Sequence, residues 1–235
     1  MDQETAQRLV DSVPEWHHGF EIFPGVSTPG TYQCASVLER LELPDDLSGC
    51  SVLDIGCADG FFSMVCAQRG AEVTGLDYRS REGTGFAVME QITGLEFRHI
   101  RDNLWNLPQH GLAQFDLVLF LGVLYHLPDP YRGLNIAAAH CRQALYLESA
   151  CETIEVAGKT AGAPLLEFTP GRSWNGDITN FWRPNPACLR AMVEDVEFEI
   201  QRELVGPLRM VIHATRAADE MLERRRRVAY GLHPV

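Results

Sequence analysis

Two aspartates and two glycines stand where chemistry on a small ligand is most readily built. Asp54 lies in the apolar run 51–55, Gly56 and Gly60 follow it as Gly-x-x-x-Gly, and Asp77 ends the next apolar run. Glycines let a backbone turn sharply and let a ligand approach without a Cβ in the way. The carboxylates could take an ammonium group at Asp54 and two ribose hydroxyls at Asp77.

The glycine spacing separates two ligand classes. Dinucleotide sites have G-x-G-x-x-G, and the middle glycine lets the backbone touch a pyrophosphate. That position is Ala58 here, which argues against a pyrophosphate. Either aspartate alone could equally be a turn cap or a solvated loop acid. In register with the glycines, they indicate a ligand with a ribose and a cationic amino acid but no phosphate, as in S-adenosylmethionine.

Strand and helix patterns alternate around this turn. Such alternation predicts right-handed crossovers and an α/β fold with a doubly wound, mostly parallel seven-stranded sheet. The expected strands are 51–55, 72–76, 95–100, 115–120, 144–148, 196–204 and 208–214. The expected helices are 61–69, 86–92, 131–141 and 186–194.

Three segments flank or interrupt this pattern. Residues 1–48, with a helix over 4–13 and an aromatic loop, are expected to form an N-terminal cap, either a lid or a cover for the core. The main domain is expected over 49–216, with an insertion after strand five at 149–183 that is either a lid or a packed surface loop. A helical tail over 217–235 carries four successive arginines, which are typical of a solvated helix end.

Composition limits the partners. The net charge of -12 repels polyanions, so a small-molecule partner is favoured over nucleic acid. The sequence shows no apolar run of membrane-spanning length and no leader pattern, so a cytoplasmic protein is expected, as a monomer or a homodimer. The 7 cysteines include no C-x-x-C pair, and no His, Cys and carboxylate set has metal-site spacing. We therefore expect neither a disulfide framework nor a metal.

Over about Gly49 to Glu148 the motifs VLDIGCADG, VTGLD and FDLVLFLGVLYHLPDP resemble the class I S-adenosylmethionine-dependent methyltransferase family. The resemblance implies a Rossmann-like fold, with S-adenosylmethionine as cofactor and S-adenosylhomocysteine as product. It implies that the turn and Leu121 with Gly122 line the methionine end, that Asp77 holds the ribose, and that Asp102 or Asn103 meets the adenine. The full predicted cofactor-binding set is Asp54, Gly56, Asp59, Asp77, Asp102, Asn103, Leu121 and Gly122.

Within that family, Trp16-His17-His18-Gly19 and GVLYH resemble the bacterial tRNA wobble-uridine carboxymethyltransferase branch, which transfers from carboxy-S-adenosylmethionine. The lysine of that branch's tryptophan-x-lysine-glycine segment is His18 here, and no lysine stands between Pro29 and Glu39. Because such cations would neutralise the extra carboxylate, the departures favour ordinary S-adenosylmethionine.

His126 follows the fourth expected strand and Glu148 ends the fifth, at the edge of the sheet where ligands bind, and these two are the predicted catalytic residues. A base helps methyl transfer to a hydroxyl or an amine, although His126 could instead cap the next helix. Arg172 or Arg183 could bind an anionic group. The predicted acceptor contacts are Trp16, His18, Tyr125, Arg172, Trp174 and Asn180.

The leading hypothesis is a methyltransferase that acts on oxygen or nitrogen of a small molecule by in-line transfer. The alternatives are a tRNA wobble-uridine modifying enzyme and a non-catalytic binding module that keeps the cofactor fold.

Overall fold

The computed structural model describes residues 1–153 and 162–217. The chain divides into two compact units, Met1–Gly111 and Leu112–Val235. Apart from residue 217, the predicted helical tail over 217–235 lies outside the described residues. The predicted domain boundaries after residues 48 and 216 stay predictions.

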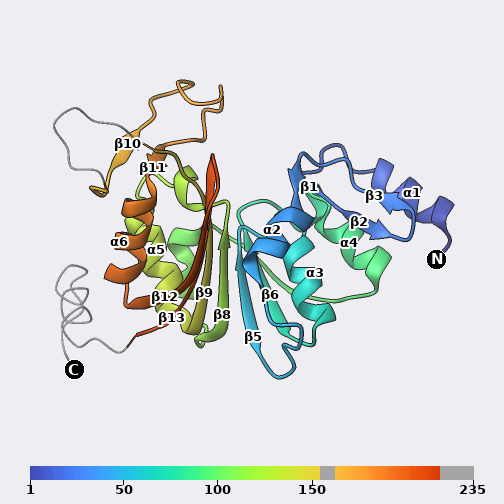
Figure 1. The fold of residues 1–235 in the computed structure, drawn as a ribbon. Coiled ribbons are helices and arrows are strands. Elements are labelled where there is room, and N and C mark those ends of the chain that lie inside the picture. Colours follow the sequence, from blue (N-terminus) through green and yellow to red (C-terminus); the bar gives the residue numbers. More distant parts are fainter. Residues whose placement is uncertain (154–161, 218–235) are drawn as a thin grey trace. The chain divides into compact units, whose positions relative to one another are not determined.

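The N-terminal unit is built on three parallel strands in the order β5, β6, β7, joined by two helices (Figure 1). The strands are β5 (Ser51–Ile55), β6 (Glu72–Asp77) and β7 (Arg98–Arg101), and the helices are α3 (Phe61–Gln68) and α4 (Phe86–Thr93). All of β5 except its first residue is buried, as expected for a parallel strand covered on both faces. Its polar exception, Asp54, is therefore enclosed with the apolar residues.

The cap of this unit contains more structure than predicted. It holds α1 (Gln3–Asp11), the parallel pair β1 (His18–Gly19) and β4 (Tyr32–Gln33), the antiparallel pair β2 (Glu21–Phe23) and β3 (Val26–Ser27), and α2 (Cys34–Leu41). Helix α2 was not predicted, because its first flanking residue, Gln33, makes no side-chain capping bond that would mark a helix start. Two 3₁₀ turns follow β6 and β7: η1 (Arg81–Gly83) and η2 (Leu104–His110).

The C-terminal unit is built on four main strands. Strand β8 (Phe115–Leu121) pairs in parallel with β9 (Cys141–Ala150), and β13 (Arg209–Arg216) pairs antiparallel with both β9 and β12 (Phe198–Val205). Helices α5 (Pro130–Ala139) and α6 (Pro186–Asp195) lie side by side against these strands (Figure 1). Each begins with an Asp or Asn cap followed by proline, the usual start signal of a helix.

With three main strands in one unit and four in the other, paired mostly in parallel, the predicted α/β fold class is confirmed. The expected insertion contains a small antiparallel hairpin, β10 (Leu166–Phe168) and β11 (Trp182–Pro184), and a 3₁₀ turn, η3 (Leu124–His126), follows β8. Within the described ranges, no helix is long and apolar enough to cross a membrane.

Candidate functional site

The glycine turn follows β5 and has an unusual backbone. Gly56, Ala58 and Gly60 have φ values of +75°, +50° and +84°. At Gly60 the requirement is packing, since a Cβ there would lie 2.3 Å from Met89 Cε on α4. Ala58 takes the left-handed conformation in spite of its Cβ, and its N–H donates to Asp77 Oδ2 over 3.0 Å. Together with the N–H groups of Gly56 and Cys57, which donate to Leu76 O, this bond joins the turn to the end of β6.

Asp54 is the first buried carboxylate beside this turn. Its Oδ2 accepts a hydrogen bond from Ser63 Oγ on α3 over 2.7 Å. Burial, and to a smaller extent the nearby Asp77 charge, raise the pKa of Asp54 to about 6, against the Ser63 hydrogen bond that lowers it. A cationic ligand group beside Asp54 would stabilise its charged form.

Asp77 ends β6 and is surrounded by donors. Besides Ala58 N, Arg79 contributes its backbone N–H to Oδ1 at 2.9 Å and its guanidinium at 3.3 Å to each oxygen. The Asp77 side chain is 4% exposed and the Arg79 side chain 36%. Arg79 was not predicted as a site residue, although it lies two positions after Asp77.

Asp59 connects the turn to the cap. Its Oδ2 accepts from the backbone N–H groups of His17 (2.7 Å) and His18 (2.8 Å), and its Oδ1 accepts from Gly85 N (3.0 Å) at the start of α4. Three backbone donors thus occupy the carboxylate that was predicted to bind cofactor. These bonds hold the cap loop against the turn, and the predicted cofactor contact of Asp59 stays a prediction.

Trp16 and His18 are both buried within the cap. The Trp16 indole N–H donates to Val10 O over 3.0 Å, and its ring packs over Gly85, where a Cβ would lie 2.1 Å from it. His18 packs edge-on against Phe62 of α3, with its Nδ1 buried and without a hydrogen-bond partner. Burial lowers the pKa of His18 to about 3, so its ring is neutral. The predicted acceptor contacts of both residues stay predictions.

The loop after β7 lies beside the Asp77 end of β6, because Asp102 N donates to Asp77 O over 3.0 Å. The Asp102 carboxylate accepts from Asn103 N and Asn106 Nδ2, and its Oδ2 lies 2.8 Å from His110 Nε2. Hydrogen bonds, led by that of Asn106, lower the pKa of Asp102. Asn103 caps η2.

In the C-terminal unit, His126 is held by the insertion. Its Nδ1 lies 3.0 Å from the Thr179 carbonyl oxygen and 3.0 Å from Thr179 Oγ1, whose own proton goes to Asp177 Oδ1 over 2.7 Å. Since a carbonyl only accepts, Nδ1 carries the proton and Nε2 keeps its lone pair. Burial lowers the pKa of His126, which keeps the ring neutral near pH 7.

Tyr125, Arg209 and Glu148 form a second cluster. Both terminal nitrogens of Arg209 donate to the Tyr125 hydroxyl, at 3.1 and 3.0 Å, and Arg209 Nε lies 2.8 Å from Glu148 Oε1. The Glu148 side chain is 1% exposed and that of Arg209 28%. The pair holds Arg209 against β9, and the predicted catalytic role of Glu148 stays a prediction. Burial raises the pKa of Tyr125 to about 12, so it is a hydroxyl donor.

The end of β8 is open at its backbone. Gly122 has φ +71°, and an added Cβ would meet only Glu148 Oε2, at 3.8 Å, an ordinary contact. Its N–H donates to the Glu148 carbonyl oxygen over 2.9 Å, and Leu121 is paired with Glu148 in register. Gly122 is half-buried and Leu121 is buried, and their predicted contacts with the cofactor stay predictions.

The insertion docks on the segment that follows β8. Phe181 N donates to Tyr125 O over 3.0 Å, and the Trp174 ring lies edge-on to Tyr125 at 6.0 Å. Asn180 is buried beside this contact, and its Nδ2 reaches Trp174 O at 3.4 Å. The aromatic insertion therefore packs as an ordered loop against Tyr125. It also contacts His126, so packing and a role beside the site are compatible.

The two arginines considered for an anionic acceptor group differ. Arg183 is paired with Glu152 and Glu167, so its charge is already neutralised. Arg172 is exposed on the insertion. No group of three or more His, Cys, Asp or Glu side chains that could hold a metal occurs among the residues that the structure describes.

Comparison with known proteins identifies the family. A family described as a methyltransferase domain matches residues 28–201. The ubiquinone biosynthesis O-methyltransferase of Proteus mirabilis is 38% identical over 90 residues, which are 38% of this chain and 36% of that protein. The aligned part thus spans little more than a third of that relative's length.

Two solved structures share the fold. The N-terminal domain of EvdMO1 with bound S-adenosylhomocysteine has 20% identity and a TM-score of 0.64, covering 93% of this chain and 98% of that one. Magnesium protoporphyrin IX methyltransferase of Synechocystis PCC 6803 with bound S-adenosylmethionine has 21% identity and a TM-score of 0.55, covering 78% and 77%. The fold agrees with the family match, and the chain belongs to the methyltransferase-domain family.

Proposed function

We propose that this chain uses S-adenosylmethionine to methylate an oxygen or nitrogen atom of a small molecule and releases S-adenosylhomocysteine. The observation that carries this proposal is the pair of buried carboxylates, Asp54 and Asp77, at the glycine turn. Burial of two like charges is costly unless a cation or several donors meet them. A ligand ammonium group would stabilise the charge of Asp54, and Asp77, which already has protein donors, is a hydrogen-bond acceptor for a ribose diol.

The residues of the N-terminal unit fit this cofactor. Asp54 faces the ammonium group, directly or through water, and Asp77 takes the ribose hydroxyls. The Asp102 loop, bonded to the backbone of Asp77, takes the adenine amino group. S-adenosylmethionine supplies an electrophilic methyl group when bound, and the chain's own part is to hold and orient its donor and acceptor.

On the acceptor side, His126 is the proposed base. Its Nε2 takes the proton of the acceptor O–H or N–H as the new bond to carbon forms, and the electron pair of the broken carbon–sulfur bond stays on sulfur. Tyr125, fixed by Arg209, donates a hydrogen bond to the acceptor, and Trp174 provides an apolar contact.

The names of similar proteins support a small-molecule acceptor. The relatives act in ubiquinone biosynthesis, and a fold neighbour from Burkholderia thailandensis is a 1,6-didemethyltoxoflavin-N1-methyltransferase. The net charge of -12 opposes RNA binding. The wobble-uridine alternative rests on the short motifs around His18 and His126 alone.

Methyl transfer from labelled S-adenosylmethionine tests the proposal, with bulk tRNA and a metabolite extract as separate acceptor pools. We expect label in a small molecule and none in tRNA, and a His126→Ala control that loses most of that label. Label confined to tRNA would overturn the assignment of the acceptor. A protein that fails to bind S-adenosylhomocysteine in calorimetry would be a binding module for something else.

A further inference from the structure

The Asp77 carboxylate has a full set of donors. A carboxylate offers about four lone-pair positions. Two receive backbone N–H groups, from Ala58 and Arg79, and the other two face Nε and Nη2 of the Arg79 guanidinium, each at 3.3 Å. The Arg79 guanidinium therefore covers one lone-pair position on each oxygen of Asp77.

A ribose diol needs the same two positions. Its two hydroxyls each donate one hydrogen bond, and the backbone donors cannot leave without unfolding the turn. We propose that the Arg79 guanidinium occupies the place of the ribose diol on Asp77 and competes with the cofactor for it. This inference rests on the proposed role of Asp77 as the ribose ligand.

The surroundings favour exchange by a side-chain rotation. The Arg79 side chain is 36% exposed whereas that of Asp77 is 4% exposed, so the guanidinium reaches solvent while the carboxylate stays in place. The Tyr78 ring lies 5.8 Å from the guanidinium carbon and is itself exposed, which offers the released cation an alternative partner. The 3.3 Å contacts are also longer than the 2.7–2.9 Å typical of strong charged pairs.

Competition predicts that removal of the guanidinium increases the affinity for the cofactor. In Arg79→Ala, calorimetry should show S-adenosylhomocysteine binding about three- to fivefold tighter than in the wild type, the factor expected for a partly exposed ion pair. Arg79→Lys offers a point charge in place of the planar guanidinium, so its affinity should lie between those of the wild type and Arg79→Ala. Rising salt should narrow the gap between wild type and Arg79→Ala, because it screens the pair.

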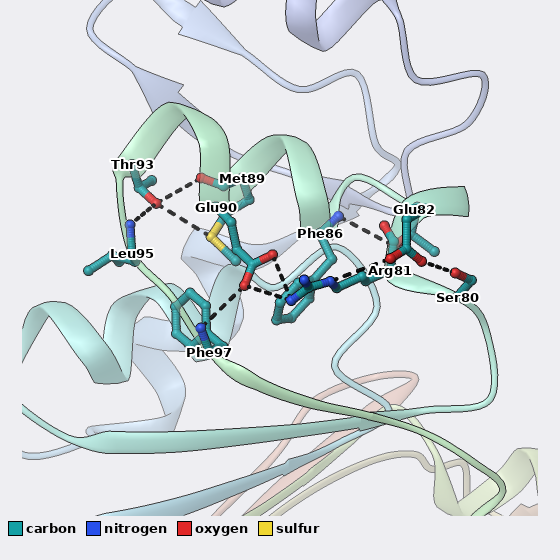
Figure 2. Close-up of polar contacts among 10 residues, drawn as sticks. Ser80, Arg81, Glu82, Phe86, Met89, Glu90, Thr93, Leu95 and Phe97 are labelled. Atoms are coloured by element: carbon teal, nitrogen blue, oxygen red, sulfur yellow. Dashed lines mark hydrogen bonds and ion pairs between the residues drawn. The ribbon is translucent and has the colours of Figure 1, made fainter.

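Two further variants isolate the cause. Arg81→Ala removes a neighbouring arginine that pairs with Glu90 at 3.3 Å and with Glu82 at 3.6 Å, in the network that Figure 2 shows. This variant should leave the affinity unchanged. In an Asp77→Asn background, which itself should bind the probe more weakly, adding Arg79→Ala should bring no gain.

The outcomes are distinct. Weaker or unchanged binding by Arg79→Ala, with binding still dependent on Asp77, would overturn the competition alone. Unchanged binding by Asp77→Asn would overturn the ribose assignment, and with it the proposed cofactor site.

Discussion

The Nδ1 atom of His126 lies 3.0 Å from the carbonyl oxygen of Thr179, which is 53 positions further along the chain. This bond decides which nitrogen of the ring is basic. The insertion therefore affects the chemistry as well as the packing, because its bond to Nδ1 leaves Nε2 as the nitrogen with a free lone pair.

Removing the base should lower turnover. His126→Ala should reduce kcat by about 10²–10⁴-fold, the usual contribution of a positioned base. Thr179→Val keeps the carbonyl and loses only the hydroxyl, so it should cost less. Steady-state kinetics with the acceptor that the labelling experiment identifies would measure kcat for both variants. Calorimetry with S-adenosylhomocysteine should show unchanged cofactor affinity.

The pH profile is a second check of His126. Its pKa is lowered below 6.5 by burial, against the raising effects of the Thr179 bond and the Asp177 charge. The acidic limb of kcat/KM should therefore break below pH 6.5, and His126→Ala should lack that limb. A limb that survives in the variant would assign the base elsewhere.

Asp54 should make stability depend on pH. Its folded pKa of about 6 lies above the ordinary 3.8, so its contribution is complete below pH 3.8 and is lost as pH rises through 6. The loss amounts to about 3 kcal/mol. Asp54→Asn keeps an acceptor for Ser63 and cannot ionise. The free energy of unfolding of this variant, relative to that of wild type, should therefore increase between pH 4 and pH 8, as urea titrations would measure.

A bound ammonium group should reverse this effect. Stabilisation of the wild type by S-adenosylhomocysteine should grow as pH rises through about 6, and Asp54→Asn should lose that growth. A difference between the two proteins that is independent of pH would mean that Asp54 ionises with an ordinary pKa.

Local patterns predicted most of the framework. Strand β5 has the predicted bounds, because an apolar run ended by glycine leaves little choice. Strand β7 begins at Arg98 and not at residue 95, because Leu95 follows the left-handed end of α4 at Gly94 and the chain needs a few residues to reach the sheet. Such boundaries depend on pairing rather than on residue type.

The partners of the site residues were less accessible to sequence reasoning. Arg79 could have been flagged, since it follows Asp77 by two positions. Arg209 meets Glu148 only through the antiparallel register of β13 on β9, in which Val211 faces Glu148. Thr179 meets His126 only because the insertion folds back on η3. No local pattern encodes either contact.

His18 should make the cap sensitive to acid. Its folded pKa of about 3 lies below the ordinary 6.5, because of burial and of the His17 and Arg79 charges, so stability is lost as pH falls below 6.5. The loss is about 1.4 kcal/mol per pH unit. His18→Asn cannot take up this proton, so the difference in Tm between pH 7.5 and pH 5.5 should be smaller for it. Equal differences would show that His18 stays neutral at no cost.

Arg209 and Glu148 should stabilise the fold only as a pair. Arg209→Ala leaves Glu148 buried without its cation and should cost about 3 kcal/mol of unfolding free energy. Arg209→Met with Glu148→Met removes both charges and should recover most of that loss in urea titrations. The double variant should still lose turnover, because the Tyr125 hydroxyl is no longer fixed. Full activity in it would remove Tyr125 from the proposed acceptor contacts.

Asp59 acts as a non-covalent crosslink. Its carboxylate closes one loop of 42 positions to His17 and another of 26 positions to Gly85, with the glycine turn as the common anchor. Closing loops of that length is entropically unfavourable, and here it is rewarded only once the turn presents the carboxylate. We therefore expect ordering of the N-terminal segment to depend on the glycine turn, so folding of the cap should report on folding of the turn.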